Sequence, residues 1–173
     1  HPWRRFVAVG ETNSFTSTDG IRWSRHSFPT NDSKEKLVFG NGYFLLAVRI
    51  PAQQAAFERY IRRGVGYVGV HSASDTEYDW TWYTNMVGRM FHVHPAIQTA
   101  AMKVEDRNFP GMDRFAERFL FTEEWYEFDA PRSDKLQYLL SVDEQTYRPA
   151  TQKGGGMGAF HPVSWRQTYD GGR

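Results

Sequence analysis

The stretch PAQQAAFERYIRRGVGYVGVHSASDTEYDW (51–80) decides the fold class of this chain. Its first part is rich in helix formers, with Pro51 at the first turn and Gly64 placed to end the helix. Residues 66–70 follow as an apolar run without polar alternation, the pattern of a strand covered on both faces in a parallel sheet. A helix leading into a buried strand predicts an α/β layer architecture. The face of this helix that we expect to be buried carries Ala56, Phe57, Tyr60 and Ile61.

Downstream of this stretch, the hydrophobic pattern predicts further elements of both kinds. Residues 82–91 predict a shorter helix, and the apolar runs at 98–104 and 136–142 predict two strands. The glycine-rich loop at 153–156 is predicted to be mobile, because glycine restricts the backbone least.

Upstream of residue 51 the pattern changes to short apolar runs separated by turn residues, which is typical of antiparallel β structure. Asn41-Gly42 lies between two such runs and predicts a hairpin, since these residues tolerate two consecutive positive φ angles. Asp19-Gly20 marks another turn. We therefore predict two domains, a β-hairpin segment at 1–50 and an α/β domain at 51–173.

The segment from Ser17 to Trp23, STDGIRW, resembles a sialidase-type Asp-box repeat. In that family the motif closes a hairpin turn of a propeller blade, so the resemblance implies a structural role for Asp19 and Trp23. A single copy does not close a propeller, whose blades pack against neighbours in a ring. Residues 1–50 alone are therefore expected to have marginal stability.

Composition excludes several classes of function. The 21 basic and 20 acidic residues give a net charge of +1 without long blocks of one sign, which disfavours a nucleic-acid partner. The absence of cysteine excludes disulfides, thiolate metal sites and a cysteine nucleophile. No apolar run approaches the roughly 20 residues that a bilayer span requires. No export signal is visible, but without an initiating methionine a lost leader, the compartment and the oligomeric state stay open.

Several local motifs in the C-terminal two thirds resemble one family, the ThuA-like (trehalose-utilisation) family of the class I glutamine amidotransferase-like superfamily. The resemblance covers residues 51–173. It implies a partial doubly wound, flavodoxin-like sheet with helices on both faces. The motifs that carry it are GYVGVHSASDTEYDW (66–80), KVEDR (103–107), EEWYEF (123–128), HPVSW (161–165) and YDGGR (169–173).

The chain departs from the family pattern in two respects. The family's domain has further strands ahead of the 51–63 helix and after residue 173, so the domain is expected to be incomplete at both ends. Open sheet edges invite pairing, and the missing strands are expected to come from another chain or from oligomerisation. Phe160 stands where the family usually has an aspartate, which removes a hydrogen-bond acceptor from the neighbouring His161.

The resemblance also locates a candidate catalytic site. In the superfamily a sharp turn after a central strand usually displays a cysteine, whereas here His71 occupies that position, which excludes cysteine-dependent glutamine hydrolysis. His71, Glu124 and His161 all lie in family motifs, and imidazoles with a carboxylate can exchange protons near pH 7. The same three residues could alternatively coordinate a divalent metal. The structural alternative for His71 is a hydrogen-bonded histidine at a strand end.

A sugar-binding wall is the second element of the predicted site. Aromatic rings stack on sugars, although about half of these aromatic residues are expected to belong to the core. His92 and His94 form a weaker metal candidate and are better explained as surface histidines. The residues predicted to contact substrate are Ser72, Asp75, Trp80, Trp125, Tyr126 and Trp165.

The sequence therefore predicts a domain of carbohydrate metabolism that takes a small sugar or sugar derivative and uses histidine and carboxylate acid–base chemistry or a divalent metal. Two alternatives stay open. One is a non-catalytic carbohydrate-binding or interaction module, and the other is a truncated fusion fragment without activity.

Overall fold

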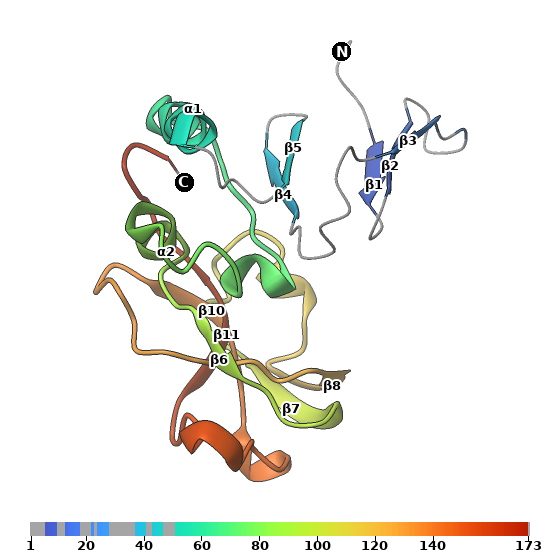
Figure 1. Ribbon diagram of the computed structural model, residues 1–173. Coiled ribbons are helices and arrows are strands. Elements are labelled where there is room, and N and C mark those ends of the chain that lie inside the picture. The colour runs from blue at the N-terminus through green and yellow to red at the C-terminus, as the bar shows by residue number, and fades with distance from the viewer. Residues whose placement is uncertain are drawn as a thin grey trace. The chain divides into compact units, whose positions relative to one another are not determined.

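The computed structural model describes residues 6–9, 13–17, 22, 24–27, 37–40, 43–46 and 51–172 (Figure 1). The chain divides into two compact units. One comprises His1–Glu77 together with Asp170–Arg173, and the other comprises Tyr78–Tyr169. None of the helices among the described residues has the length and hydropathy that crossing a bilayer requires.

The N-terminal strands form two small antiparallel groups, as the sequence predicts. Strands β1 (Phe6–Val9), β2 (Asn13–Ser17) and β3 (Ser24–Ser27) pair in that order, and β4 (Leu37–Gly40) pairs with β5 (Tyr43–Leu46). Because Gly40 faces Tyr43, a two-residue loop joins β4 to β5, which confirms the predicted hairpin. Its loop residues Asn41-Gly42, the Asp19-Gly20 turn and Trp23 lie outside the described residues, so the Asp-box resemblance stays a prediction.

Helix α1 (Pro51–Arg62) confirms the predicted helix and part of its predicted buried face. Phe57 and Ile61 are buried and Tyr60 is half-buried, whereas Ala56 is exposed. Gly64 follows with a φ of +82°, where glycine is favoured. The C-terminal end of the chain packs against this helix, since a Cβ added to Gly172 would lie 2.5 Å from Cγ2 of Ile61. An ion pair of 2.8 Å between Arg62 Nε and Asp170 Oδ2 joins the same two segments.

The segment 66–70 differs from the predicted buried strand. Among the described residues it contributes a single β-bridge, at Val68, and Val68 and Val70 are 70% and 75% exposed. The prediction of a strand covered on both faces is therefore wrong for these residues. An apolar run indicates a preference for extended backbone. Whether its side chains are buried depends on the strands and helices that pack beside it.

Helix α2 (Thr81–Val87) is shorter than the predicted helix at 82–91. It ends at Gly88, which adopts a left-handed conformation with φ of 91° and donates its N–H to the carbonyl of Thr84. A Cβ at this position would also lie 2.6 Å from Cδ2 of Leu136, so both backbone and packing require glycine here. Phe91 instead begins strand β6 (Phe91–Val93).

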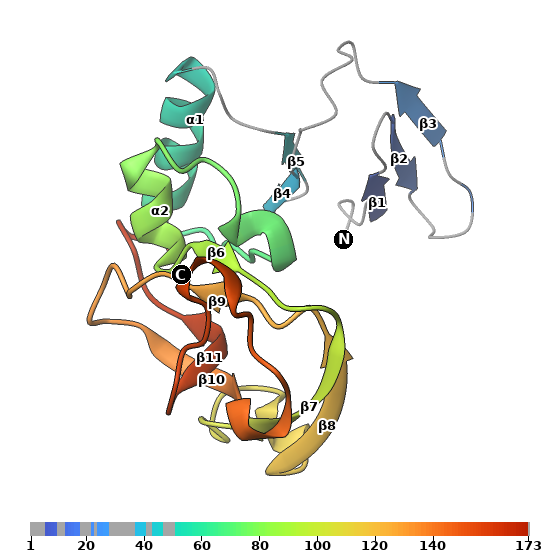
Figure 2. The same ribbon diagram turned by 60° about the horizontal axis from the view of Figure 1, so that its bottom comes forward.

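The main sheet contains strands β7 (Gln98–Val104), β8 (Arg118–Glu123), β10 (Gln137–Val142) and β11 (His161–Arg166) in the order β11-β10-β7-β8 (Figure 2). Strand β6 pairs separately with β9 (Glu127–Phe128). The predicted strands at 98–104 and 136–142 are confirmed. Every strand pair formed by the described residues is antiparallel, so the fold is mixed α/β and the doubly wound arrangement is not confirmed.

One face of this sheet forms the core of the second unit. Ala100, Met102 and Val104 alternate with less buried residues along β7, as the period-two geometry of a strand requires. Two aromatic residues from flanking segments complete this core, namely Trp125 and Tyr147. The segments that carry the candidate site residues 124–127 and 144–147 are therefore fixed by core packing.

Candidate functional site

The side chain of His161, at the start of β11, is buried within a polar cluster. It is 1% exposed, and its Nε2 lies 2.8 Å from the carbonyl oxygen of Tyr126. Its Nδ1 lies 2.9 Å from the hydroxyl of Tyr147 and 3.0 Å from Oε1 of Glu144. Both ring nitrogens are therefore already engaged by protein groups.

This geometry determines the protonation of the cluster. A carbonyl oxygen only accepts, so Nε2 of His161 carries a proton and donates it to Tyr126. Burial lowers the pKa of His161 against the opposing effects of its hydrogen bond to Tyr126 and of the Glu144 and Glu127 carboxylates, which favours the neutral ring. Burial and the same two carboxylates raise the pKa of Tyr147, so its phenol keeps its proton.

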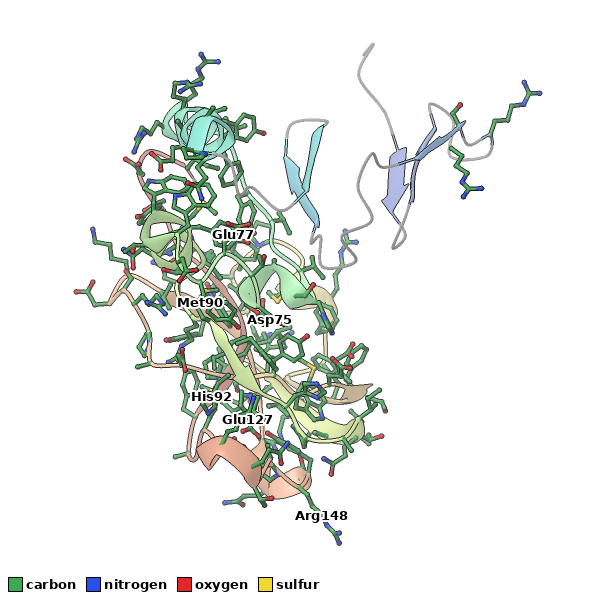
Figure 3. The ribbon with its side chains drawn as sticks, viewed as in Figure 1. Asp75, Glu77, Met90, His92, Glu127 and Arg148 are labelled. Carbon is green, nitrogen blue, oxygen red and sulfur yellow. The ribbon has the colours of Figure 1, made fainter. Side chains whose placement is uncertain are left out.

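Glu127 and Glu144 hold the glycine-rich loop that follows Tyr147. Glu127, labelled in Figure 3, is 1% exposed and accepts from the backbone N–H of Ala150 at 2.8 Å and of Gly156 at 2.5 Å. Glu144 accepts from the backbone N–H of Met157 at 2.6 Å and of Gly158 at 2.7 Å. The loop at 153–156 that composition predicts to be mobile is thus anchored at the amide of Gly156, and its flanks are anchored at Ala150, Met157 and Gly158.

A second cluster, formed by Glu124, His94 and Tyr126, is more accessible. Oε2 of Glu124 lies 4.0 Å from Nε2 of His94, and the two side chains are 27% and 36% exposed. The ring of Tyr126 stacks on His94 with a centroid distance of 5.6 Å and an interplanar angle of 23°. Phe91 packs against Tyr126 at 4.3 Å. The structure therefore brings a predicted catalytic carboxylate beside a histidine and an aromatic residue predicted to bind substrate.

His71 opens a short 3-10 helix (His71–Ser74) in the first unit. Its φ of 52° lies in the left-handed region, and the preceding Val70 is extended, so the chain turns sharply at this residue. Oγ of Ser74 donates to the carbonyl of His71 at 3.0 Å and holds the turn. His71 is exposed, Ser72 and Asp75 are half-buried, and all three belong to this turn.

The predicted aromatic residues divide between core and partly accessible positions. Trp125 is buried and donates its indole N–H to the carbonyl of Gln98 at 2.9 Å. Trp80 is buried between stacking contacts with Trp82 and Tyr83. Trp165 is half-buried and donates to the carbonyl of Val87 at 2.7 Å. Their indole groups fulfil structural roles, as expected for about half of this set.

Sequence reasoning missed several members of both clusters. Glu127 lies within a family motif but carried no assigned role, and Glu144 and Tyr147 lie outside all such motifs. These residues join the cluster through contacts in the folded chain that no local motif reports. Tyr147, for example, contacts His161 although 14 residues separate the two in the sequence. His94 was identified only as a weak metal candidate beside His92, whereas its described ion-pair contact is with Glu124.

The predicted set His71, Glu124 and His161 is distributed over the two units. His161 and the Glu124-His94-Tyr126 cluster are linked through Tyr126, whose carbonyl accepts from His161. His71 belongs to the other unit, so its participation with Glu124 stays a prediction. Within the part of the chain that the structure describes, no group of three or more histidine and acidic side chains has a geometry suited to a metal ion.

Comparison with known proteins identifies the family. The family model for ThuA, described as trehalose utilisation, matches residues 35–173, and the chain therefore belongs to the ThuA family. This membership relates the chain to carbohydrate metabolism.

One solved structure shares this fold. It is the crystal structure of a ThuA-like protein from Bacteroides uniformis ATCC 8492, which is 24% identical with a TM-score of 0.59. The alignment covers 69% of this chain and 51% of that protein, so the chain spans about half the length of that relative. No curated protein matches the chain.

Proposed function

We propose that this chain binds a sugar or sugar derivative at the Glu124-His94-Tyr126 cluster and that Glu124, with His94, provides acid–base chemistry there. The observation that carries the proposal is the half-exposed Glu124–His94 pair, whose Oε2 and Nε2 lie 4.0 Å apart beside the ring of Tyr126. Membership of a family described as trehalose utilisation supports a sugar as the ligand.

The chemical argument rests on exposure and charge. A carboxylate accepts hydrogen bonds from sugar hydroxyls, and an imidazole can take or give a proton near pH 7. An aromatic ring offers an apolar surface against which the C–H face of a sugar packs. Glu124, His94 and Tyr126 supply these three properties within one contiguous and partly accessible cluster.

His71 enters the proposal through its backbone. A non-glycine residue with positive φ costs free energy, on the order of 1–3 kcal/mol, and such residues concentrate at functional sites. The turn presents an exposed imidazole immediately before two half-buried polar residues of the predicted set, Ser72 and Asp75. We propose a catalytic role for this exposed imidazole.

His161 is proposed as a positioning residue. Its ring is buried, and both nitrogens are occupied, so it is poorly placed to transfer a proton to a ligand or to coordinate a metal. Its hydrogen bond to the carbonyl of Tyr126 instead fixes the backbone that presents the Tyr126 ring and the adjacent Glu124. The metal-assisted alternative of the sequence prediction is accordingly less favoured than acid–base chemistry.

The test is a binding and turnover panel of trehalose, its monosaccharide and oxidised or acidic sugar derivatives. Binding is followed calorimetrically and conversion by NMR. We expect a sugar in the panel to bind, and Glu124→Gln to weaken its affinity about 10- to 100-fold, the value of a charged hydrogen bond. Glu117→Gln is the matched control, because Glu117 is an exposed glutamate of the same unit. Equal affinities in both variants would refute the site.

A non-catalytic sugar-binding module is the second candidate, and the burial of His161 favours it. With His161 unable to reach a ligand, one of the three predicted catalytic groups serves structure. Wild-type binding without conversion of any panel member, together with unchanged affinity in His71→Ala, would select this candidate. Conversion that is lost in His71→Ala would select the enzyme.

A further inference from the structure

We infer that Arg89 and Tyr138 form a binding site for a small carboxylate ligand, a site independent of the proposed sugar function. Arg89 lies between α2 and β6, next to Met90, which is labelled in Figure 3. Its side chain is buried, since the residue is 8% exposed. A buried guanidinium is costly unless an anion and a full set of acceptors compensate its charge.

The hydrogen bonds of Arg89 go to neutral acceptors. Nη1 donates to the backbone carbonyl of Asp129 at 3.0 Å, and Nε and Nη2 donate to the Tyr138 hydroxyl at 3.3 Å and 3.2 Å. A guanidinium carries five N–H donors, so part of the fork has no acceptor among the described residues. The face of the Tyr138 ring, 5.6 Å from Cζ of Arg89, adds a cation–π contact but no negative charge.

No carboxylate of the described residues forms an ion pair with Arg89. The nearest candidate by connectivity is Asp129, whose carbonyl accepts from Arg89. Its carboxylate, however, faces His92, with 3.5 Å between Oδ1 of Asp129 and Nδ1 of His92. The positive charge of Arg89 is therefore buried without a protein counter-ion in the part of the chain that is described.

Tyr138 contributes a further donor. Its hydroxyl oxygen already accepts from Arg89, and its own O–H proton has no acceptor among the described residues. The ring of Phe160 packs edge-on against Tyr138 at 5.0 Å and is 42% exposed, so this side of the pair borders solvent. Unused N–H donors and an unused O–H thus lie together beside an aromatic surface.

The ligand chemistry follows from these donors. A carboxylate presents two coplanar acceptor oxygens that match a guanidinium fork, and its single negative charge balances one arginine. A phosphate dianion would exceed the charge of the single cation described here. We therefore assign the site to a monoanionic carboxylate carried by a small ligand.

The test uses acetate as the probe and sodium chloride at equal ionic strength as the reference. Binding to the folded state raises Tm in proportion to ln(1 + [L]/Kd), so we expect a Tm increase that grows with acetate concentration. In wild-type protein, acetate should also shift the NMR signal of the Arg89 Nε–H group. This second readout stays available if an Arg89 variant does not fold.

Arg89→Gln and Tyr138→Phe should each raise the apparent Kd for acetate about tenfold or more, which is the effect of losing one charged hydrogen bond. Arg132→Gln is the matched control, because Arg132 is an exposed arginine of the same unit. The assignment is overturned if acetate and chloride give the same Tm and the Arg89 signal does not move, or if Arg89→Gln responds like Arg132→Gln. A response to phosphate without one to acetate would overturn the assignment to a carboxylate.

Discussion

His161 donates the proton on its Nε2 to the carbonyl oxygen of Tyr126 across a distance of 2.8 Å, and this bond joins the buried cluster to the accessible one. The donor belongs to β11 and the acceptor to the segment before β9, so two distant parts of the chain meet here. Loss of the bond would release the backbone that carries Glu124 and Tyr126.

His161→Ala is therefore expected to destabilise the fold by roughly 2–4 kcal/mol, because it opens a cavity and removes the hydrogen bonds of the ring to the Tyr147 hydroxyl and the Tyr126 carbonyl. The free energy of unfolding is measured by urea denaturation. His92→Ala, at an exposed histidine of the same unit, is the control and should change stability much less. Equal losses in the two variants would contradict the role assigned to His161.

The same histidine predicts a pH dependence of stability. Burial holds the pKa of His161 below its usual 6.5, so the unfolded chain binds more protons than the folded one as the pH falls below about 6.5. Stability contributed by the neutral ring is complete above that pH and decreases towards the folded-state pKa. The groups that face the ring are Glu144, Glu127 and Tyr147.

We expect Tm to fall between pH 7 and pH 5, and to fall less steeply in His161→Gln, whose amide does not titrate. Thermal melts across this range at constant ionic strength provide the measurement. A wild-type profile that is flat, or one that His161→Gln reproduces, would show that His161 does not titrate as burial predicts.

The carboxylate of Glu127 is expected to determine the order of the glycine-rich loop. Glu127→Gln replaces one acceptor oxygen by an amide that donates, which places a donor against the N–H of Ala150 or Gly156. We expect a loss of about 2–3 kcal/mol and faster hydrogen exchange at the Gly156 amide. Glu123→Gln, at an exposed neighbour, should leave that exchange rate unchanged. An unaltered Gly156 rate in Glu127→Gln would exclude the anchoring role.

Gly155 tests the packing of the same loop. A Cβ on Gly155 would lie 2.5 Å from the carbonyl oxygen of Ala150 and 2.5 Å from Oε2 of Glu127. Gly155→Ala should therefore cost about 1–3 kcal/mol through overpacking. A Cβ added to Gly158 would meet no atom within 4 Å beyond its chain neighbours, so Gly158→Ala should cost about 1 kcal/mol, from its positive φ alone. Chemical denaturation measures the free energy of unfolding of both variants. A larger loss in Gly158→Ala than in Gly155→Ala would contradict this account.

The elements that local pattern determines were predictable from the sequence. Helix α1 has helix formers, proline at its start and glycine beyond its end, and the β7 run alternates buried and exposed residues. Residues 66–70 were misassigned because burial of an apolar run depends on neighbours that periodicity does not report. Helix α2 ends early because Gly88 adopts the left-handed conformation that closes a helix, a local stop signal within the predicted range 82–91.

Glu124, Tyr126 and His161 lie in family motifs, which is why the sequence predicts them as site residues, and their role stays a prediction. Their partners were not predictable, since Glu144 and Tyr147 reach His161 only through the strand pairing of β10 with β11. Arg89 gave no sequence signal at all. Its significance rests on burial and on acceptors from Asp129 and Tyr138, both at least 40 residues away.

The central claim is that His94 and Glu124 act on one ligand, and a double-mutant cycle tests it most directly. The affinity of the tightest-binding panel sugar is measured for wild type, His94→Ala, Glu124→Gln and the double variant. The account predicts that the two losses are not additive and differ by about 0.5 kcal/mol or more, as for residues that share a partner. Strictly additive losses would contradict the claim and place the two residues in separate sites.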